Sequence, residues 1–391
     1  MLKANKYRIY PDNSQKELLA KHFGSVRFLY NLALETKTQA YSANRVNISR
    51  YELSAQLKDL KEDCPWLKEI NSQSLQTALL HLDIAYNSFF KGKAKFPAFK
   101  KKSNRQSFTC PQNVTIENDR LYIPKFKNGI EMVQHRPLCG IIHSATISKT
   151  PTDKYFVSIL VENGIDKPYK KPVTEKTAVG IDLGLKTFAT LSDGTIFENP
   201  THLRNSLKRL QVLQYRASRK MKGSNNRKKA NKNVAVLHER ITNQRDDFLH
   251  KVSDVITKQY DIICIEDLSP KNMTKNHNLA LSINDAGWGK FVTFLKYKSE
   301  WRGKNVFEIG RFDPSSKMHN KCGYINKELT LADREWICPR CGELVQRDKN
   351  AASNILDWGL LKYSGMERAE GLPELTTLVG AVKEEKFIAD F

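Results

Sequence analysis

With 391 residues, the chain is long enough for two or three hydrophobic cores, and we expect a multidomain protein. Its 64 Lys and Arg residues outnumber 42 Asp and Glu residues, and the formal net charge of +22 predicts a polyanionic partner. Nucleic acid is the leading candidate, because Lys and Arg hold a phosphate backbone without reading its sequence. A basic surface of the ribosomal or heparin-binding kind is the alternative.

The sequence excludes a membrane-spanning helix, because it has no apolar run of about 18 residues. The N-terminus lacks the apolar region of a secretory signal, so we expect a location inside the cell. Seven cysteines are an odd number and do not suggest a secreted disulfide framework. Four of them are scattered, and we interpret them as reduced thiols: Cys64, Cys110, Cys139 and Cys264.

The N-terminal part of the chain predicts one strand followed by helices. Residues 3–10 alternate between apolar and polar side chains, as a strand does, and Asn13 and Ser14 introduce a helical pattern. Further helices are expected over residues 49–60 and 73–90. Their spacing favours an ordinary helix bundle over a helix-turn-helix unit.

Residues 91–105 contain seven basic residues and no acidic one. Phe96 and Phe99 are interleaved with them, and Pro97 prevents a continuous helix. Basic residues with interleaved aromatic rings predict a loop that contacts nucleic acid. The alternative is a solvated linker.

Short alternating stretches follow over residues 107–162, separated by turn residues, and predict a small β domain in the form of a barrel. Residues 167–172 have the composition of a linker, so we expect a domain boundary near residue 173.

The next segment predicts a β-meander whose first strand ends in a carboxylate. A buried strand runs through Gly180 to Asp182, a second strand is expected over residues 187–191, and Asp193 and Gly194 predict a hairpin turn into a third.

Residues 202–260 are expected to form a long helical hairpin. Residues 216–232 contain eight basic residues and no acidic one, which predicts a phosphate-contacting surface; a solvated helix face is the alternative. The apolar run over residues 260–268 then predicts a central strand that is buried on both faces, and residues 305–309 a further short strand.

Three carboxylates from distant segments are expected to meet at one edge of the sheet. Asp182 and Glu266 each close a buried strand, and Asp348 opens a predicted helix. Strand ends of an α/β sheet converge at one edge. Clustered carboxylates repel each other unless cations neutralise them, and hard oxygen ligands favour Mg²⁺ or Mn²⁺.

Two such ions would activate a water and stabilise the leaving 3′ oxygen of a phosphodiester. Taken singly, each acid could instead cap a helix or bind loop amides; the order of the three in the chain favours the joint catalytic site. His250 is a candidate acid or base, but a helix histidine is more often structural, and we leave it out of the expected site.

A metal knuckle is predicted by His319 and Cys322 in the form H-x₂-C, followed by Cys338 and Cys341 in the form C-x₂-C. Three thiolates and an imidazole would close a tetrahedral structural zinc site with no open position for a catalytic water. Reduced cysteines beside an incidental histidine are the alternative.

With these motifs together, residues 1–358 resemble the TnpB family, the RNA-guided nucleases that insertion sequences encode and that are related to type V CRISPR effectors. The resemblance rests on the two strand-end motifs around Asp182 and Glu266, the stretch at residues 312–317, the knuckle, and residues 347–352 around Asp348. It places the catalytic acids on Asp182, Glu266 and Asp348. The family usually has Cys at position 319 and often Asp at position 346, where this chain has His319 and Gln346.

The resemblance implies a multidomain fold that combines α/β, all-β and helical parts. Residues 1–10 and 104–172 would form a β-barrel wedge domain, into which a helical recognition lobe of residues 11–103 is inserted. Residues 173–314 and 346–358 would form a RuvC-like, ribonuclease-H-like nuclease domain, with a zinc ribbon at residues 315–345 inserted. We assign no function to the C-terminal tail of residues 359–391.

The resemblance further implies a cytoplasmic protein of a prokaryotic cell that uses a guide RNA from the transposon end, two Mg²⁺ (or Mn²⁺) ions and one Zn²⁺ to cut double-stranded DNA beside a short motif. Its alternatives are a cleavage-deficient repressor and a strand-transfer enzyme; a structural nucleic-acid chaperone would not need three acids. The expected phosphate contacts come from the two basic tracts: Lys91, Lys93, Lys95, Lys100, Lys101, Lys102, Arg105, Arg216, Arg219, Lys220, Lys222, Arg227, Lys228, Lys229 and Lys232.

Overall fold

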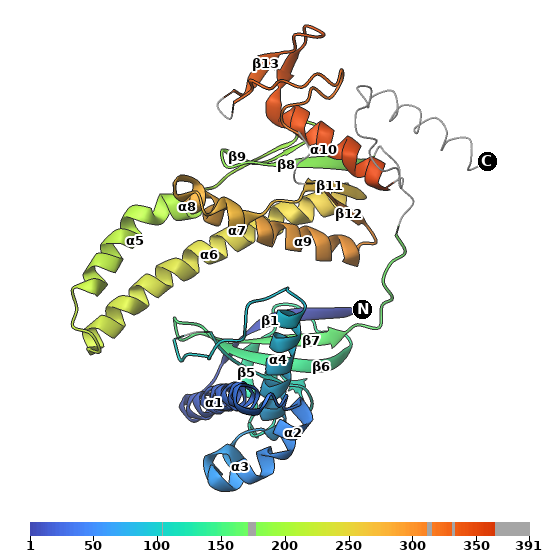
Figure 1. Ribbon diagram of the computed structural model, residues 1–391. Helices are drawn as coiled ribbons and strands as arrows, with labels where there is room; N and C mark the ends of the chain where they lie inside the picture. The colour runs from blue at the N-terminus through green and yellow to red at the C-terminus, as the bar shows by residue number, and fades with distance from the viewer. Residues whose placement is uncertain (104, 171–176, 311–314, 331–332, 364–391) are drawn as a thin grey trace. The chain divides into compact units, whose positions relative to one another are not determined.

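The structure is a computed structural model, and it describes residues 1–103, 105–170, 177–310, 315–330 and 333–363 (Figure 1). The chain divides into two compact units, Met1–Asp166 and Lys167–Phe391. The two units divide after Asp166, a few residues before the boundary that the sequence predicted near residue 173. The N-terminal unit is called unit 1 and the C-terminal unit is called unit 2.

Unit 1 contains a seven-stranded antiparallel sheet of order β2-β6-β7-β1-β5-β4-β3. Its strands are β1 (Leu2–Tyr10), β2 (Gln106–Cys110), β3 (Thr115–Glu117), β4 (Arg120–Tyr122), β5 (Ile130–Val133), β6 (Ile141–Lys149) and β7 (Tyr155–Glu162). β1 lies inside the sheet because it pairs with β7 on one side and β5 on the other. The order ends at β2 and β3, which do not pair within the described residues. The ladder is therefore open where the sequence predicted a closed barrel.

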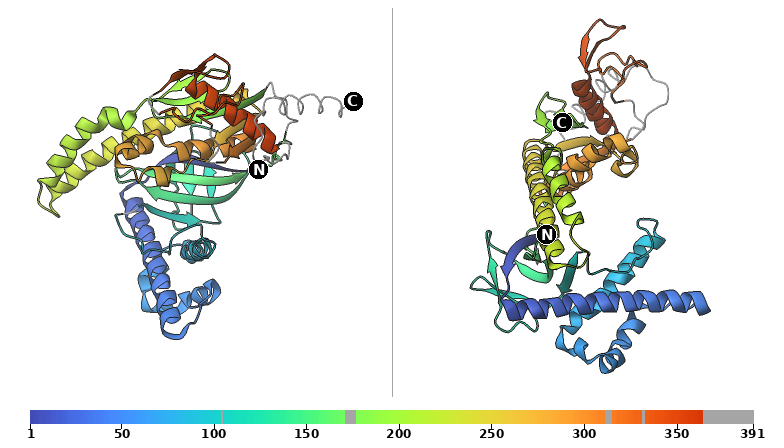
Figure 2. Two further views of the ribbon diagram at one scale, coloured as in Figure 1. Left: turned by 45° about the horizontal axis from the view of Figure 1, so that its top comes forward. Right: turned by 90° about the vertical axis from the view of Figure 1, so that its left-hand side faces the viewer.

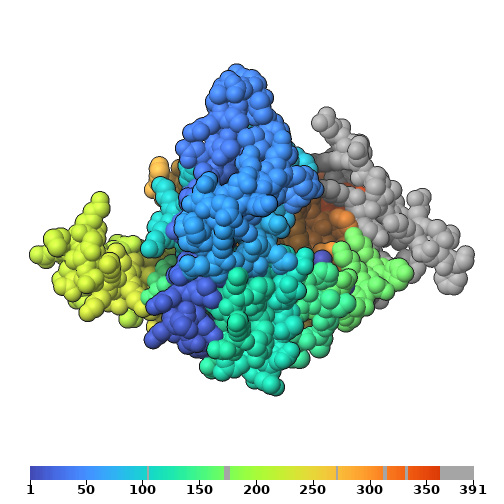
Figure 3. All heavy atoms as spheres, turned by 90° about the horizontal axis from the view of Figure 1, so that it is seen from below, coloured from blue at the N-terminus to red at the C-terminus, as the bar shows by residue number. Residues whose placement is uncertain are grey.

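The helices of unit 1 follow β1 and share one core with the sheet. They are α1 (Asn13–Asn44), α2 (Arg50–Ala55), α3 (Leu57–Asp63), the 3₁₀ helix η1 (Pro65–Glu69) and α4 (Ser72–Phe90). Asp12 starts α1 with a capping box, in which its side chain accepts from the Gln15 N–H at 2.8 Å. The helix expected over residues 49–60 is divided at Gln56 into α2 and α3. In Figure 3 these helices, in blue, form one continuous body beside the strands.

Unit 2 contains a five-stranded sheet of order β10-β9-β8-β11-β12. The strands are β8 (Ala178–Leu183), β9 (Thr187–Leu191), β10 (Ile196–Glu198), β11 (Ile262–Glu266) and β12 (Asn305–Ile309). β8, β9 and β10 form the predicted antiparallel meander, whereas β11 runs parallel to both β8 and β12. Residues 262–265 of β11 are fully buried, as expected for a central strand with apolar side chains on both faces.

Helices cover both faces of this sheet (Figure 1). The helices are α5 (His202–Ser218), α6 (Asn225–Gln259), α7 (Pro270–Met273), α8 (His277–Ala286), α9 (Trp288–Trp301) and α10 (Arg347–Tyr363). α6, α8 and α9 pack on the face of Ile263 and Ile265, and α10 packs on the face of Ile262 and Cys264. α5 and α6 form the predicted hairpin, visible in Figures 1 and 2.

The segment between β12 and α10 forms a small separate core around Leu329, Trp336, Cys338 and Val345. Its hairpin consists of β13 (Glu335–Ile337) and β14 (Leu344–Gln346), and α10 begins directly after β14. The family-like stretch at residues 312–314 lies outside the described residues, as does the tail from residue 364. No helix in the described part of the chain is long and apolar enough to cross a membrane.

Candidate functional site

The structure brings Asp182, Glu266 and Asp348 to one edge of the unit 2 sheet. Side chains alternate between the two faces of a strand. Gly180 and Cys264, two residues before the strand-end acids, face α10. Asp182 and Glu266 therefore project on the side that α10 covers, and Asp348 lies in the first turn of that helix.

The electrostatics of Asp182 reflect this arrangement. Burial, followed by the negative charges of Asp348 and Glu266, raises the pKa of Asp182 from its ordinary 3.8 to about 7, against a smaller opposing effect of Arg347 and Arg334. A carboxyl group with such a pKa is held at a position where negative charge is unfavourable. A divalent cation at this edge would remove that cost, and the carboxylates supply the oxygen ligands that Mg²⁺ prefers.

Asp348 is paired with two arginines that the sequence did not single out. Arg334 Nη1 lies 3.0 Å from Asp348 Oδ2, and Arg347 Nη2 lies 3.0 Å from Asp348 Oδ1. Arg334 immediately precedes β13, and its carbonyl accepts the Arg347 N–H at 2.9 Å. Its position therefore depends on the segment that forms the β13–β14 hairpin. An ion held by Asp348 would share this carboxylate with both guanidinium groups.

A second cluster consists of His319, Cys322, Cys338 and Cys341, whose ligand atoms all lie within 4.8 Å of one another. The Nδ1 atom of His319 is 3.1 Å from Cys322 Sγ and 3.4 Å from Cys341 Sγ, and Cys322 Sγ is 3.5 Å from Cys338 Sγ. A tetrahedral zinc site with Zn–S bonds of about 2.3 Å has ligand edges of similar length. In the described part of the chain, this is the one group of His, Cys and acidic residues with that geometry. Asp348 of the carboxylate group is directed toward its arginines.

His319 is suited to be the fourth ligand, although it stands where the family usually has Cys. Its side chain is buried, and burial lowers the pKa of the imidazole, which favours the neutral ligand form. Its Nδ1 atom faces the sulfurs, while Nε2 lies 3.7 Å from the Glu343 carboxylate. A carboxylate behind a ligating imidazole orients the ring and raises its basicity.

Most of the basic side chains at residues 91–105 are exposed to solvent. Lys100 is the exception: its Nζ atom lies 3.8 Å from the Tyr30 ring, and burial lowers the pKa of its ammonium group. Phe96 packs edge-on against Tyr86, with ring centroids 5.6 Å apart, and so anchors the segment. Phe90 is 75% exposed, and Phe99 is 53% exposed.

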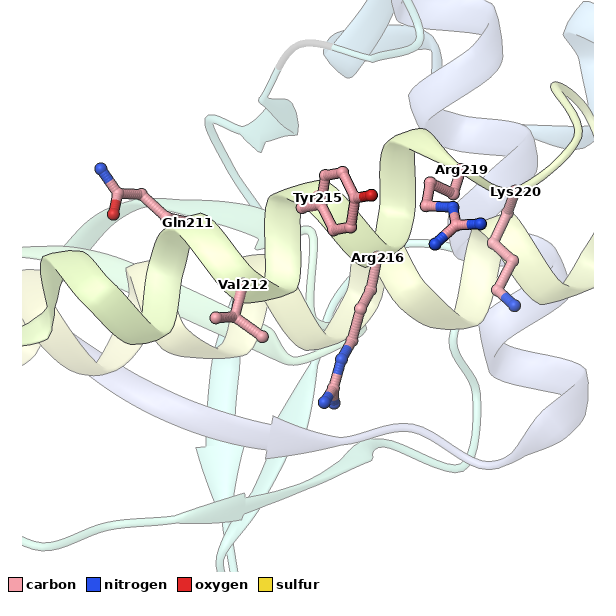
Figure 4. Close-up of a pocket in the computed structure, with 6 residues that line it drawn as sticks. All are labelled: Gln211, Val212, Tyr215, Arg216, Arg219 and Lys220. Carbon is pink, nitrogen blue, oxygen red and sulfur yellow. The ribbon is translucent and has the colours of Figure 1, made fainter.

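The second basic tract, residues 216–232, spans the end of α5, the turn after it and the beginning of α6. Arg216, Arg219 and Lys220 line a surface pocket of α5 together with the exposed Tyr215 (Figure 4). Arg227 differs, because its Nη1 atom donates to the Lys220 carbonyl at 2.9 Å and closes the turn.

His250 has a structural role. Its ring stacks on Phe294 with centroids 3.9 Å apart, and its carbonyl accepts from Lys298 Nζ at 2.6 Å.

Three family models match the chain. A model described as "Probable transposase" matches residues 157–277, one described as "Cas12f1-like, TNB domain" matches residues 288–355, and one described as "Helix-turn-helix domain" matches residues 1–45. The last range holds β1 and the single helix α1, so no helix-turn-helix is formed within it.

Among solved structures, the chain resembles the cryo-EM structure of a Cas12f1–sgRNA–target DNA complex. The TM-score is 0.56 at 11% sequence identity, with 91% of this chain and 98% of that chain covered. At this identity, the likeness concerns the fold alone: the chain has a fold of mixed α and β structure similar to that of Cas12f1.

Two similar bacterial proteins carry the name "Putative RNA-guided DNA endonuclease". The one from Streptomyces pristinaespiralis is 40% identical over 364 residues, covering 92% of this chain and 89% of the relative. The Escherichia coli (strain K12) protein InsQ is 33% identical over 377 residues, covering 92% of each chain. A "TnpB-like protein" of Acanthamoeba polyphaga mimivirus is 24% identical over 399 residues. On these relatives, the chain belongs to the TnpB family.

Proposed function

We propose that the chain is an RNA-guided, Mg²⁺-dependent DNA endonuclease of a transposable element that cuts target DNA beside a short motif. The observation that carries the proposal is the convergence of Asp182, Glu266 and Asp348. Burial, together with the charges of the other two acids, raises the pKa of Asp182 to about 7. Acids gathered at such cost, in a chain with a net charge of +22, point to metal-assisted chemistry on a polyanion.

The sheet topology supports a RuvC-like, ribonuclease-H-like assignment for unit 2. An antiparallel meander continues into two parallel strands, and the acids come from the first strand, the central strand and the covering helix. In unit 1, we assign the open sheet to a wedge domain and α1–α4 to a recognition lobe. Residues 315–345 would be the inserted zinc ribbon.

Asp182, Glu266 and Asp348 would hold the catalytic ions. Bound Mg²⁺ supplies activation of the attacking water and stabilisation of the leaving 3′ oxygen. The protein contributes the rigid strand ends that orient Asp182 and Glu266, and the helix that presents Asp348. Arg334 and Arg347 balance the charge of Asp348 and keep this carboxylate ordered.

His319, Cys322, Cys338 and Cys341 would hold one structural Zn²⁺. All four positions are occupied by protein ligands, so the site would stabilise the small fold around it and leave no place for a reacting water.

The exposed basic side chains of residues 91–105 and of the α5–α6 turn would contact the guide RNA and the target DNA. Relatives that are named for RNA-guided DNA cleavage support both partners, and two acid-free basic tracts on separate units provide surface for more than one backbone.

The decisive experiment compares one protein preparation with its own RNA, with an RNA carrying a rewritten guide, and with no RNA, on matched and unmatched plasmids in Mg²⁺. We expect cleavage only where guide and plasmid match, and none with Asp182→Ala, while Asp247→Ala on the exposed side of α6 serves as the matched acid control. Mismatches near the adjacent motif should abort binding more than distant ones. Cleavage that ignores the rewritten guide would refute RNA guidance.

The same reactions test the two rival functions. A cleavage-deficient repressor would bind the matched plasmid without cutting it. A strand-transfer enzyme, which shares the metal chemistry and which the transposase family model suggests, would yield joined rather than merely cut products.

A further inference from the structure

Two asparagines of α10 join this helix to the loop that carries His319. The Asn350 Oδ1 atom accepts the Asn320 N–H at 2.8 Å, and its Nδ2 atom donates to the Met318 carbonyl at 2.6 Å. Each side of the His319 backbone is therefore held by the same side chain.

Asn354, one turn later, extends these contacts. Its Nδ2 atom donates to the carbonyls of Ser315 and Met318, both at 2.7 Å, and its Oδ1 atom accepts from Asn320 Nδ2 at 3.0 Å. Asn320 Nδ2 also donates to Asp357 Oδ2 at 2.8 Å. The loop of residues 315–320 is thus fixed to three consecutive turns of one helix face.

The burial of these amides makes the contacts specific. Asn354 is 0% exposed and Asn350 is 7% exposed, and a buried polar group that loses its hydrogen-bond partners destabilises the fold. Only a side chain with both a donor and an acceptor can make both sets of bonds, so neither Asp nor Leu can replace Asn here. Residues four apart lie on one face of a helix, as this loop requires.

The same helix turn carries Asp348, two residues before Asn350. In the loop, His319 lies between Met318 and Asn320, the two residues whose backbone groups bond to Asn350. Its imidazole faces the sulfurs of the cysteine cluster. A shift of the loop would therefore move α10, and a shift of α10 would move the imidazole.

We propose that Asn350 and Asn354 are positioning residues that couple the His319–Cys341 metal cluster to Asp348, so that Zn²⁺ binding and Mg²⁺ binding stabilise each other. The proposal rests on the proposed function for its two metals. Coupling between two sites is reciprocal: if zinc orders the helix that presents Asp348, Mg²⁺ on the carboxylates must slow the loss of zinc.

The test uses the full chain with its RNA and two independent measurements. The first is the rate of zinc transfer to TPEN, a chelator with little affinity for Mg²⁺, measured with and without Mg²⁺. The second is the Mg²⁺ concentration that gives half-maximal cleavage. The variants are Asn350→Ala, Asn354→Ala and the milder Asn320→Ala, which keeps the backbone N–H bond to Asn350. Ser353→Ala is the matched control, because Ser353 lies on the same helix and its hydroxyl bonds only within it, to the Lys349 carbonyl.

We expect the wild type and Ser353→Ala to release zinc more slowly in Mg²⁺. The asparagine variants should release zinc about tenfold faster and lose the Mg²⁺ effect, as partners of metal ligands commonly contribute 10–100-fold to affinity. They should also need several-fold more Mg²⁺, with much of the maximal rate regained at saturation. In Asp348→Ala, Mg²⁺ should no longer slow the release of zinc, although the bonds of Asn350 and Asn354 to the loop remain.

An unchanged rate of zinc release in all three asparagine variants would overturn the coupling. The same holds if the variants lower thermal stability but need no more Mg²⁺ than the wild type, because the asparagines would then be structural only. If the wild type does not cleave, the proposed endonuclease fails, and zinc release with and without Mg²⁺ still decides the coupling.

Discussion

Gly180 lies directly against Ala352: a Cβ atom at position 180 would be 2.0 Å from the Ala352 carbonyl oxygen and 2.6 Å from the Leu356 nitrogen. Only a residue without a side chain allows α10 to approach β8 this closely. Since Asp182 lies near the end of β8 and Asp348 in the first turn of α10, the missing side chain of Gly180 determines how near these two acids lie. The glycine that precedes the strand-end acid is therefore part of the site.

Gly180→Ala should displace α10 and weaken the site. Overpacking of this kind costs about 1–3 kcal/mol, and we expect a corresponding loss of unfolding free energy together with a larger Mg²⁺ requirement for cleavage. Gly289→Ala is the matched control, because Gly289 lies in helix α9 with nothing within 4 Å of the added Cβ. That variant should gain up to about 1 kcal/mol. Equal stability of the two variants would contradict the close packing of α10 on β8.

Asp182→Asn should stabilise the Mg²⁺-free protein, and by more at pH 8 than at pH 5. The folded pKa of Asp182 is about 7 and its ordinary value is 3.8. Between these values the folded state binds more protons than the unfolded state, so the stability of the wild type falls as pH rises through this range. Asparagine cannot ionise and escapes the loss. Thermal unfolding of wild type and variant at the two pH values, without chelator so that zinc is retained, measures the difference.

Asp254 provides the opposite case for comparison. Its hydrogen bonds with Lys258 and Arg302 lower its pKa to about 2, so its contribution to stability is present at neutral pH and is lost on acidification. Asp254→Asn should therefore destabilise the protein at pH 8. If Asp182→Asn raises the melting temperature above that of the wild type by more at pH 5 than at pH 8, the raised pKa of Asp182 is contradicted.

Zinc should co-purify with the protein at about one ion per chain. Cys338→Ser should release it and destabilise the small core around Trp336, because metal binding and folding of such a segment are linked. His319→Cys should retain zinc through a fourth thiolate, whereas His319→Ala should lose it. Metal analysis of protein prepared without chelators checks all three variants. Protein free of zinc from the outset would exclude a zinc site at this cluster.

The sequence predicted the central strands because their apolar runs and turn residues are local signals. Residues 262–266 are apolar up to the closing acid, and the Asp193–Gly194 turn fixes the meander around Asp182. The prediction of a closed barrel was wrong for the described pairing, because closure depends on contacts between β2 and β3 that no local pattern encodes. Helices α7, α8 and α9 were not predicted. The ion pair of Arg334 with Asp348 and the bonds of Asn354 could not be predicted either, because they join segments whose proximity appears only in the folded chain.

The exposed lysines of residues 91–105 should determine the salt dependence of nucleic-acid binding, and Phe90 should contribute without changing it. Replacing Lys91, Lys93 and Lys95 by Gln should weaken binding to all sequences and reduce the slope of log affinity against log salt by about one unit per lost contact. Phe90→Ala should weaken binding to unpaired strands at an unchanged slope, because a stacked base contributes about 1–3 kcal/mol without displacing counterions.

Lys100→Gln is the matched control for these lysines. Lys100 belongs to the same basic tract, but its ammonium group lies over the Tyr30 ring and its backbone N–H donates to Asn31 Oδ1 at 2.7 Å. We therefore expect a loss of thermal stability with an unchanged salt slope. Titrations of the purified protein with single- and double-stranded RNA and DNA, each at several salt concentrations, separate the two effects. If the triple lysine variant keeps the wild-type slope while Lys100→Gln changes it, the contacts come from the packed side of the segment, and the exposed lysines are a solvated surface.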